Sequence, residues 1–209
     1  PDFVSVDVQA ALAGDAVVRQ RTSLSMQVDS ARPDATVAVT NARIITMDAE
    51  RSVIEGGTLL IEANRIVAVG DAAEVQVPAE AQVFDAAGKT IIPGLIDAHA
   101  HGPYGRGSVI PEQNYSVLAH LALGVTTVHN PSSSASQAFA ASEYQRAGLI
   151  LAPRIFSTAE IVYGAKGVSY ADIQSLQDAL NHIRRLKAQG ATSIKNYNQP
   201  RREQRQQVI

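Results

Sequence analysis

Residues 92–102 read Ile-Pro-Gly-Leu-Ile-Asp-Ala-His-Ala-His-Gly, and this stretch decides the fold. A Pro-Gly turn is followed by an apolar segment, so a strand is expected over residues 95–99. Alternate residues of a strand point to the same face, so His99 and His101 should project together, about 7 Å apart, with Asp97 one step below. Two imidazoles at that spacing can tilt onto one ion. The stretch predicts a strand that ends in a metal-binding pair.

C-terminal to this stretch, segments with strand and helix patterns alternate. Strands are expected at residues 95–99, 125–128, 154–156 and 192–195, and helices at residues 115–123, 134–147, 176–188 and from residue 200 onward. Such alternation is typical of parallel βα units. A complete eightfold barrel takes about 250 residues, so residues 94–209 predict its first half, about four units and strands 1–4. A doubly wound sheet is disfavoured because Gly102, Gly105 and Gly107 do not have the spacing of a nucleotide-binding turn.

The N-terminal side of the stretch contains short strand patterns and turn residues. Residues 36–93 predict a small, incomplete β domain resembling a sandwich, with strands at residues 58–62 and 65–69 joined by the turn Ala63-Asn64. Residues 1–35 are interpreted as a linker, as extra strands of that domain, or as the exit from an upstream domain. The overall fold class is therefore α/β, with a β domain in front of a partial barrel.

Composition excludes several classes of protein. The 209 residues carry 18 Lys and Arg against 20 Asp and Glu, for a net charge of −2, which argues against a nucleic-acid binder. There is no apolar run long enough to span a bilayer. The chain has no cysteine, so thiolate metal sites and disulfides are excluded. A hydrophobic content of 45% is too high for wholesale disorder.

Several segments resemble the amidohydrolase superfamily. Residues 41–48 are similar to its opening strands and residues 65–70 to its hairpin, while residues 88–101 resemble the start of its barrel and its first metal ligands. Residues 124–131 read Gly-Val-Thr-Thr-Val-His-Asn-Pro and resemble the second strand of the imidazolonepropionase- and prolidase-like branch. Residues 145–158 and 199–206 look most similar to amidohydrolase modules that are fused behind a bacterial β-propeller.

The resemblance implies a metal-dependent hydrolase that acts on C–N bonds of an amide, a cyclic amide or a dipeptide through a metal-activated water. One or two divalent ions, with zinc favoured, would be held by His99 and His101. Lys195 matches a lysine that often carries CO₂ as a carbamate, and its alternative is an ordinary lysine at the barrel mouth. The family's other two histidines and its general-base Asp are expected beyond Ile209. On this interpretation the fragment has no catalytic base and is inactive alone.

Three further residues are interpreted as contacts to the substrate or to the metal ligands: Asp97, His129 and Tyr197. His129 ends the second strand, and a purely structural hydrogen-bonded histidine is an equal alternative. Tyr197 lies two residues after Lys195, so on a strand both side chains would point to the same face. Asn130 stands where the family often has Asp, which weakens any carboxylate role there. His120 and His182 lie in expected helices and are interpreted as surface or interface residues.

A second hypothesis is a non-catalytic half-barrel that binds or assembles with a partner chain. Its basis is the pair of unpaired sheet edges that four open units would leave. The partners expected on these interpretations are a small amide or peptide substrate, the remaining half of the barrel, an upstream β-propeller, and a second copy of the chain. Export to the periplasm or outside the cell follows from the resemblance alone, and the cytoplasm is the alternative. Neither the substrate nor the oligomeric state is fixed by the sequence.

Overall fold

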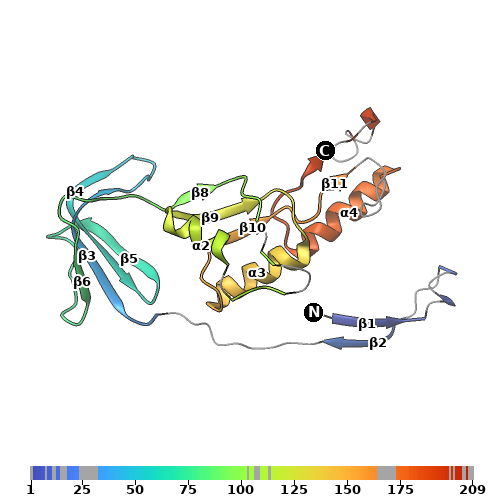
Figure 1. The fold of residues 1–209 in the computed structure, drawn as a ribbon, viewed down its shortest axis with the longest axis horizontal. Helices are drawn as coiled ribbons and strands as arrows, with labels where there is room; N and C mark the ends of the chain where they lie inside the picture. The colour runs from blue at the N-terminus through green and yellow to red at the C-terminus, as the bar shows by residue number, and fades with distance from the viewer. Residues whose placement is uncertain are drawn as a thin grey trace.

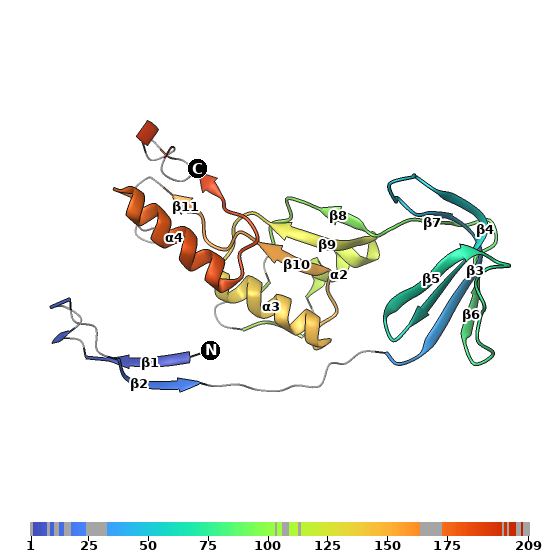
Figure 2. The ribbon, with the colours of Figure 1, turned by 180° about the vertical axis from the view of Figure 1, so that it is seen from behind.

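The structure is a computed structural model. It describes residues 2–7, 9–10, 13–14, 18–23, 33–102, 104–105, 109–112, 114–163, 173–197, 199, 201–203 and 206. Along the chain these residues form an N-terminal hairpin, a strongly curved β-sheet, and a part in which parallel strands alternate with helices (Figures 1 and 2).

The N-terminal hairpin consists of β1 (Asp2–Val6) and β2 (Val18–Ser23), which pair antiparallel from Asp2 opposite Ser23. Two strands are therefore present in the region that was interpreted as a linker, as extra strands or as the exit from an upstream domain. Its two strands form a sheet of their own, separate from the larger β-sheet.

The larger sheet is built around β3 (Thr36–Ile45), the strand on which three others assemble. It pairs antiparallel with β4 (Val53–Glu62) and parallel with both β6 (Gln82–Asp85) and β7 (Thr90–Ile91). β5 (Arg65–Asp71) continues the sheet on the far side of β4. Along β3, Ala42 and Ile44 are buried in one cluster with Leu59, whereas Ala38 is buried in a second cluster with Leu60. The expected β strands are confirmed, whereas their arrangement as a sandwich stays a prediction.

The turn between β4 and β5 has the predicted two-residue length. Ala63 and Asn64 both adopt positive φ, at 45° and 67°, and Glu62 pairs with Arg65 across the turn. Positive φ at both central residues is the conformation that matches the right-handed twist of paired strands. The Asn was the visible signal, and Ala63 adopts the same left-handed region beside it.

The second half of the chain contains the strand–helix alternation. Its elements are β8 (Leu95–Asp97), α2 (Tyr115–Ala122), β9 (Val125–Asn130), α3 (Ala135–Ala147), β10 (Arg154–Ser157), β11 (Val162–Tyr163), α4 (Leu176–Gln189) and β12 (Asn196–Tyr197). β10, β9 and β8 form one parallel sheet in that order, and β11 pairs parallel with β12. The predicted parallel βα units are confirmed, and closure into half of a barrel stays a prediction.

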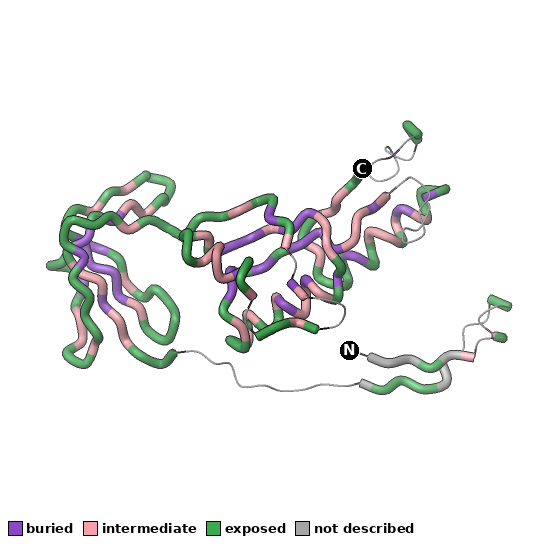
Figure 3. The backbone as a smooth tube through the Cα atoms, in the orientation of Figure 1, coloured by how far each residue is buried: buried purple, intermediate pink, exposed green. Residues whose placement is uncertain are grey.

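Apolar side chains of α2 and α3 cover one face of this parallel sheet. Val117 of α2 and Ala138 of α3 are buried against Val128 and Ile155 of the sheet. Along β9, Thr127, Val128 and Asn130 are buried, whereas Thr126 is exposed (Figure 3). A second cluster joins α4 to the segment around β11, with Leu186 and Ala179 packed against Val162. The helix expected from residue 200 onward lies mostly outside the described residues.

The helix ends agree with the sequence signals. Gly148 and Gly190 follow α3 and α4 at positive φ, 75° and 112°, the left-handed conformation that commonly ends a helix. Ser175 begins α4 with a capping box, in which its hydroxyl accepts the Asp178 N–H and the Asp178 carboxylate accepts the Ser175 N–H.

Two strand predictions are wrong in detail. The first strand ends at Asp97 and not at residue 99, because the Asp97 carboxylate accepts the His99 N–H at 2.9 Å and turns the chain out of the sheet. Of the alternate residues Ile96, Ala98 and Ala100, only Ala100 is buried, and Ile96 is 70% exposed. Among the described residues, β8 pairs with β9 alone and is an edge strand of its sheet.

The fourth strand is displaced from residues 192–195 to β12 at residues 196–197. After Gly190 ends α4, Thr192 and Ser193 form a bend. This segment still lies beside the preceding unit, because the Thr192 N–H donates to the Ser157 carbonyl and the Val162 N–H donates to the Lys195 carbonyl. Lys195 therefore immediately precedes the strand that was expected to contain it.

Candidate metal centre

His99 and His101 lie next to each other just beyond the carboxyl end of β8. Their ring centroids are 5.0 Å apart and the rings meet edge to face, at an interplanar angle of 72°. Both residues are exposed. The two imidazoles are closer than the spacing of about 7 Å expected on a strand. The turn after Asp97, and not the geometry of a strand, brings them together.

Asp97 shapes this turn through both oxygens of its carboxylate. Oδ1 accepts the His99 N–H, while Oδ2 lies 3.9 Å from Nε2 of His120 on α2. The other His120 nitrogen, Nδ1, is 2.7 Å from the Ser116 carbonyl, which can only accept, so Nδ1 carries a proton. His120 was interpreted as a surface or interface residue. Its side chain is 31% exposed, and its ring lies beside the carboxylate that forms the turn at His99.

His101 has a polar neighbour on the loop that follows β9. The Oγ atom of Ser132 lies 3.3 Å from His101 Nδ1. When Nδ1–H donates to that hydroxyl, the Nε2 lone pair is left free for a ligand, as in the outer contacts that orient metal-bound histidines. Sequence reasoning missed Ser132, because a serine in a Pro-Ser-Ser-Ser run gives no signal of its own.

His129 joins the end of β9 to the segment before β12. Its Nε2 lies 2.8 Å from Ser193 Oγ, although the residues are 64 positions apart. Its backbone carbonyl accepts the Ala100 N–H at 3.0 Å, which also fixes the turn between the two exposed histidines. His129 is half-buried.

Lys195 and Tyr197 form a second group. The Lys195 Nζ lies 5.3 Å from the Tyr197 ring centroid, within the range of a cation–π contact. The Tyr197 ring is in turn 5.9 Å from that of Tyr163 on the neighbouring strand β11. The contacts of the described residues thus bring together His99 with His101, and separately Lys195 with Tyr197.

Two buried polar groups lie behind the turn. Among the described residues, the Tyr104 hydroxyl and the Asn130 Nδ2 are buried without a hydrogen-bond partner. Burial raises the pKa of Tyr104, the nearby Asn130 amide opposes this rise, and the Asp97 carboxylate adds to it. Tyr104 was also missed, because it lies in a glycine-containing loop where neither period nor spacing marks a buried residue.

The donor chemistry of the centre suits a divalent ion only in part. Imidazole is a preferred ligand of zinc, and two imidazoles lie together here. A closed zinc site takes four ligands. Within the part of the chain that the structure describes, no group of three His, Cys, Asp or Glu residues could hold a metal ion. The two histidines therefore fit a metal site whose coordination is completed by further ligands.

Comparisons with known proteins find partial matches to hydrolases. No family profile matches the chain. The chain is 42% identical over 65 residues to N-substituted formamide deformylase of Arthrobacter pascens, covering 30% of this chain and 12% of that protein. It is 33% identical over 88 residues to enamidase of Eubacterium barkeri (41% and 22%), and 42% identical over 60 residues to imidazolonepropionase of a Geobacillus strain (26% and 14%).

These partial matches support the assignment of the chain to the amidohydrolase superfamily. Solved structures agree at the level of fold. An amidohydrolase superposes with a TM-score of 0.58 at 21% identity, and a Xaa-Pro dipeptidase with 0.56 at 19%; each match covers 77% of this chain and 46% of the other. Ochratoxinase of A. niger gives 0.56 at 16% identity over the same shares.

The chain spans 12% to 22% of the length of the three curated relatives and less than half of the matched structures. None of the described helices is long and apolar enough to cross a bilayer.

Proposed function

We propose that this chain contributes the first metal ligands of a metal-dependent hydrolase that cleaves a C–N bond in an amide, a cyclic amide or a dipeptide. The observation that carries the proposal is the pair of imidazoles 5.0 Å apart at the carboxyl end of a parallel strand. Enzymes built on parallel βα barrels have their active sites at that end. The relatives' names, among them N-substituted formamide deformylase, support chemistry at a C–N bond.

In this proposal His99 and His101 hold one or two divalent ions, with zinc favoured by the imidazole ligands. A bound ion polarises the scissile carbonyl and lowers the pKa of a water molecule toward about 7. Two groups of this chain position the ligands. Asp97 fixes the turn that carries His99, and Ser132 orients the ring of His101. Lys195, as a carbamate or as a free amine, and the aromatic ring of Tyr197 would line the opening, with His129 behind them.

Two histidines and a lysine are too few for an active centre. We propose that the remaining ligands and the general base come from the part of the protein that corresponds to the other half of the matched structures. The 209-residue chain alone is then inactive, and its activity requires that complement. The compartment in which it acts stays open.

Replacing the two histidines tests the proposal directly. In the full-length protein, His99→Ala/His101→Ala should abolish zinc uptake, measured by metal analysis after dialysis, and hydrolysis of amide and dipeptide substrates. His182→Gln on α4 is the matched control and should keep both. Wild-type activity in the double variant would overturn the assignment.

A second candidate function has one observation in its favour. The edge strand β8 exposes Leu95 by 51% and Ile96 by 70%, so an apolar sheet edge stands open in this chain. On this reading the chain is a binding module whose edge is covered by a partner. Retained metal binding and hydrolysis in the complete protein would exclude it as the main role.

A further inference from the structure

We propose that Glu160 is a positioning residue for His101, acting through the loop of residues 131–134. The inference rests on the proposed function, because it explains how one of the two metal-binding imidazoles is held. Neither Glu160 nor Ser132 stood out in the sequence. Their role follows from a chain of hydrogen bonds that connects two consecutive strand ends.

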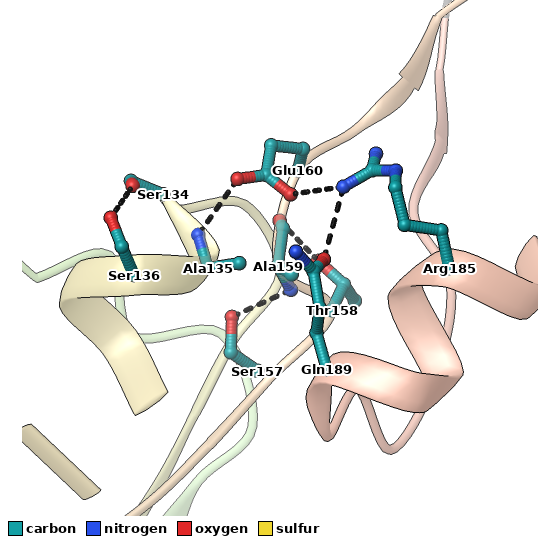
Figure 4. Close-up of polar contacts among 9 residues, drawn as sticks. All are labelled: Ser134, Ala135, Ser136, Ser157, Thr158, Ala159, Glu160, Arg185 and Gln189. Atoms are coloured by element: carbon teal, nitrogen blue, oxygen red, sulfur yellow. Dashed lines mark hydrogen bonds and ion pairs between the residues drawn. The ribbon is translucent and has the colours of Figure 1, made fainter. Parts of the chain in front are cut away.

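Glu160 supplies the cap that α3 otherwise lacks. Its Oε1 accepts the Ala135 N–H at 2.9 Å, and its Oε2 lies 3.3 Å from Arg185 Nη1 on α4 (Figure 4). Ser134 occupies the N-cap position but makes no side-chain capping bond, since its hydroxyl pairs with that of Ser136. A carboxylate at a helix N-terminus is electrostatically favourable. Glu160 therefore fixes the start of α3 from the next βα unit.

Ala159 provides a second anchor for the same loop. Its side chain is fully buried and its φ is +59°, a left-handed conformation that costs energy for a residue with a Cβ. The Ser157 hydroxyl holds it there by accepting the Ala159 N–H at 2.9 Å while donating to the Asn130 carbonyl. In this conformation the Ala159 carbonyl accepts the Ser133 N–H at 3.1 Å.

Ser132 lies between these anchors and faces His101. Its own N–H donates to Asn130 Oδ1 at 3.0 Å, so the backbone is held at residues 132, 133 and 135. The Ser132 backbone N–H is thus already bonded, and the Ser132 hydroxyl lies 3.3 Å from Nδ1 of the His101 imidazole. In this proposal the Ser132 hydroxyl accepts the Nδ1–H of His101, which leaves the Nε2 lone pair free for a ligand. The cap at Glu160 acts on His101 by holding the loop that places this hydroxyl.

The tautomer of His101 is the readout that a merely structural role would not move. It is measured in the metal-free, full-length protein by nitrogen-15 NMR with labelled histidine at about pH 8.5, well above the ordinary imidazole pKa of about 6.5. Wild type should have the Nδ1–H form in majority. Ser132→Ala and Glu160→Ala should each shift His101 toward the Nε2–H form.

Two variants separate the cap from charge and general stability. Glu160→Gln keeps an oxygen that can accept from Ala135, so it should retain the wild-type tautomer. Glu143→Gln is the matched control, since it removes another α3 ion pair, with Arg146 at 3.2 Å, away from the loop. It should leave His101 unchanged. A wild-type tautomer in both Ser132→Ala and Glu160→Ala would overturn the inference, and the Ser132 variant keeps the test valid if Glu160→Ala does not fold.

Zinc titration distinguishes this inference from the function on which it rests. Ser132→Ala and Glu160→Ala should weaken zinc binding about 10-fold, the size typical of lost outer contacts to a ligand. If wild type binds no zinc while the tautomer shift is present, the proposed function fails and the positioning role stands. If zinc binds equally in wild type and variants and the tautomer is unchanged, the positioning role fails and the metal site stands.

Discussion

The Nε2 atom of His129 lies 2.8 Å from the Oγ atom of Ser193, and this contact joins the end of β9 to the segment that carries Lys195. Ser193 lies in the segment between α4 and β12. The hydrogen bond therefore links two βα units that are separated in sequence by the unit that contains β10. We expect it to hold the residues around Lys195 against the parallel sheet.

Ser193→Ala removes this link. The free energy of unfolding should fall by about 1 kcal/mol, the usual net value of one hydrogen bond. Urea denaturation followed by circular dichroism measures the change. Thr192→Val is the neighbouring control, since the Thr192 backbone N–H that bonds to Ser157 is retained. Equal stability of Ser193→Ala and wild type would contradict a role for the contact.

Lys195 offers a test of the carbamate proposal. In the full-length protein supplied with carbon-13 bicarbonate and zinc, we expect a carbamate resonance that Lys195→Arg abolishes. The reason is that a carbamate forms on a neutral amine and converts a cation into an oxygen ligand. Lys187→Arg, at the exposed end of α4, is the control that keeps the signal. A carbamate resonance that survives Lys195→Arg would place the modification elsewhere.

Gly94 immediately precedes β8 and lies against Thr126 of β9. A Cβ at this position would overlap the side chain of Thr126, so Gly94→Ala should destabilise the fold by about 2 kcal/mol, the cost of overpacking. Thermal and urea unfolding measure the loss. Because all the overlapping atoms belong to the Thr126 side chain, adding Thr126→Gly should recover part of it. A neutral Gly94→Ala would refute the close approach.

The capping box of α4 should make the fold sensitive to acid. The Ser175 hydroxyl, followed by the Gln174 N–H, holds the pKa of Asp178 below its ordinary value of 3.8. A folded-state pKa below the unfolded one gives stability that is fully present above the unfolded value and lost as the pH falls through the folded one. Asp178→Asn should therefore flatten the decline of stability in that acid range, measured by urea denaturation at several pH values.

The carboxylate at Asp34, before β3, provides the comparison for that measurement. Asp34→Asn removes one exposed charge without touching a helix cap. It should leave the acid dependence as steep as in wild type. The prediction for Asp178 fails if both variants have the wild-type slope.

The open edge of β8 predicts self-association of the 209-residue chain. An unpaired strand that exposes Leu95 and Ile96 is a template for another chain. Sedimentation velocity should find oligomers, and Ile96→Lys should shift them toward the monomer because a charge on an edge strand opposes pairing. Val53→Lys, on a paired strand of the other sheet, should not. A monomeric wild-type chain with cooperative unfolding would contradict this prediction and favour a self-sufficient module.

The sequence predicted the elements better than the contacts. Apolar periodicity located β9, α3 and α4 to within a few residues, and the glycines at residues 148 and 190 marked helix ends correctly. These signals are local, since each depends on residues within one or two turns. The end of β8 was misplaced because a side chain, that of Asp97, competes for the backbone N–H of His99.

Only the part of the candidate site that lies within one short sequence motif was predictable from the sequence. The spacing of His99 and His101 placed them together, whereas the contacts of His101 with Ser132 and of His129 with Ser193 join residues 31 and 64 positions apart. Serine hydroxyls occur on any surface, so only the folded chain reveals which of them meets an imidazole. The burial of Tyr104 is equally a property of the packed molecule.

The pairing of β3 with β6 and β7 has a consequence for how the chain folds. Val37 pairs with Gln82 and Ile44 with Ile91, so closing these ladders requires loops of more than forty residues, whereas β3, β4 and β5 are joined by short connections. Non-local pairings form late because their loop entropy is paid first. We expect the β3–β5 meander to nucleate, with β6 and β7 docking afterwards. The docking of β7 would then fix the start of the segment that leads through Pro93 and Gly94 to His99 and His101. The histidine pair would therefore form only after the pairing of a strand that contributes no ligand to it.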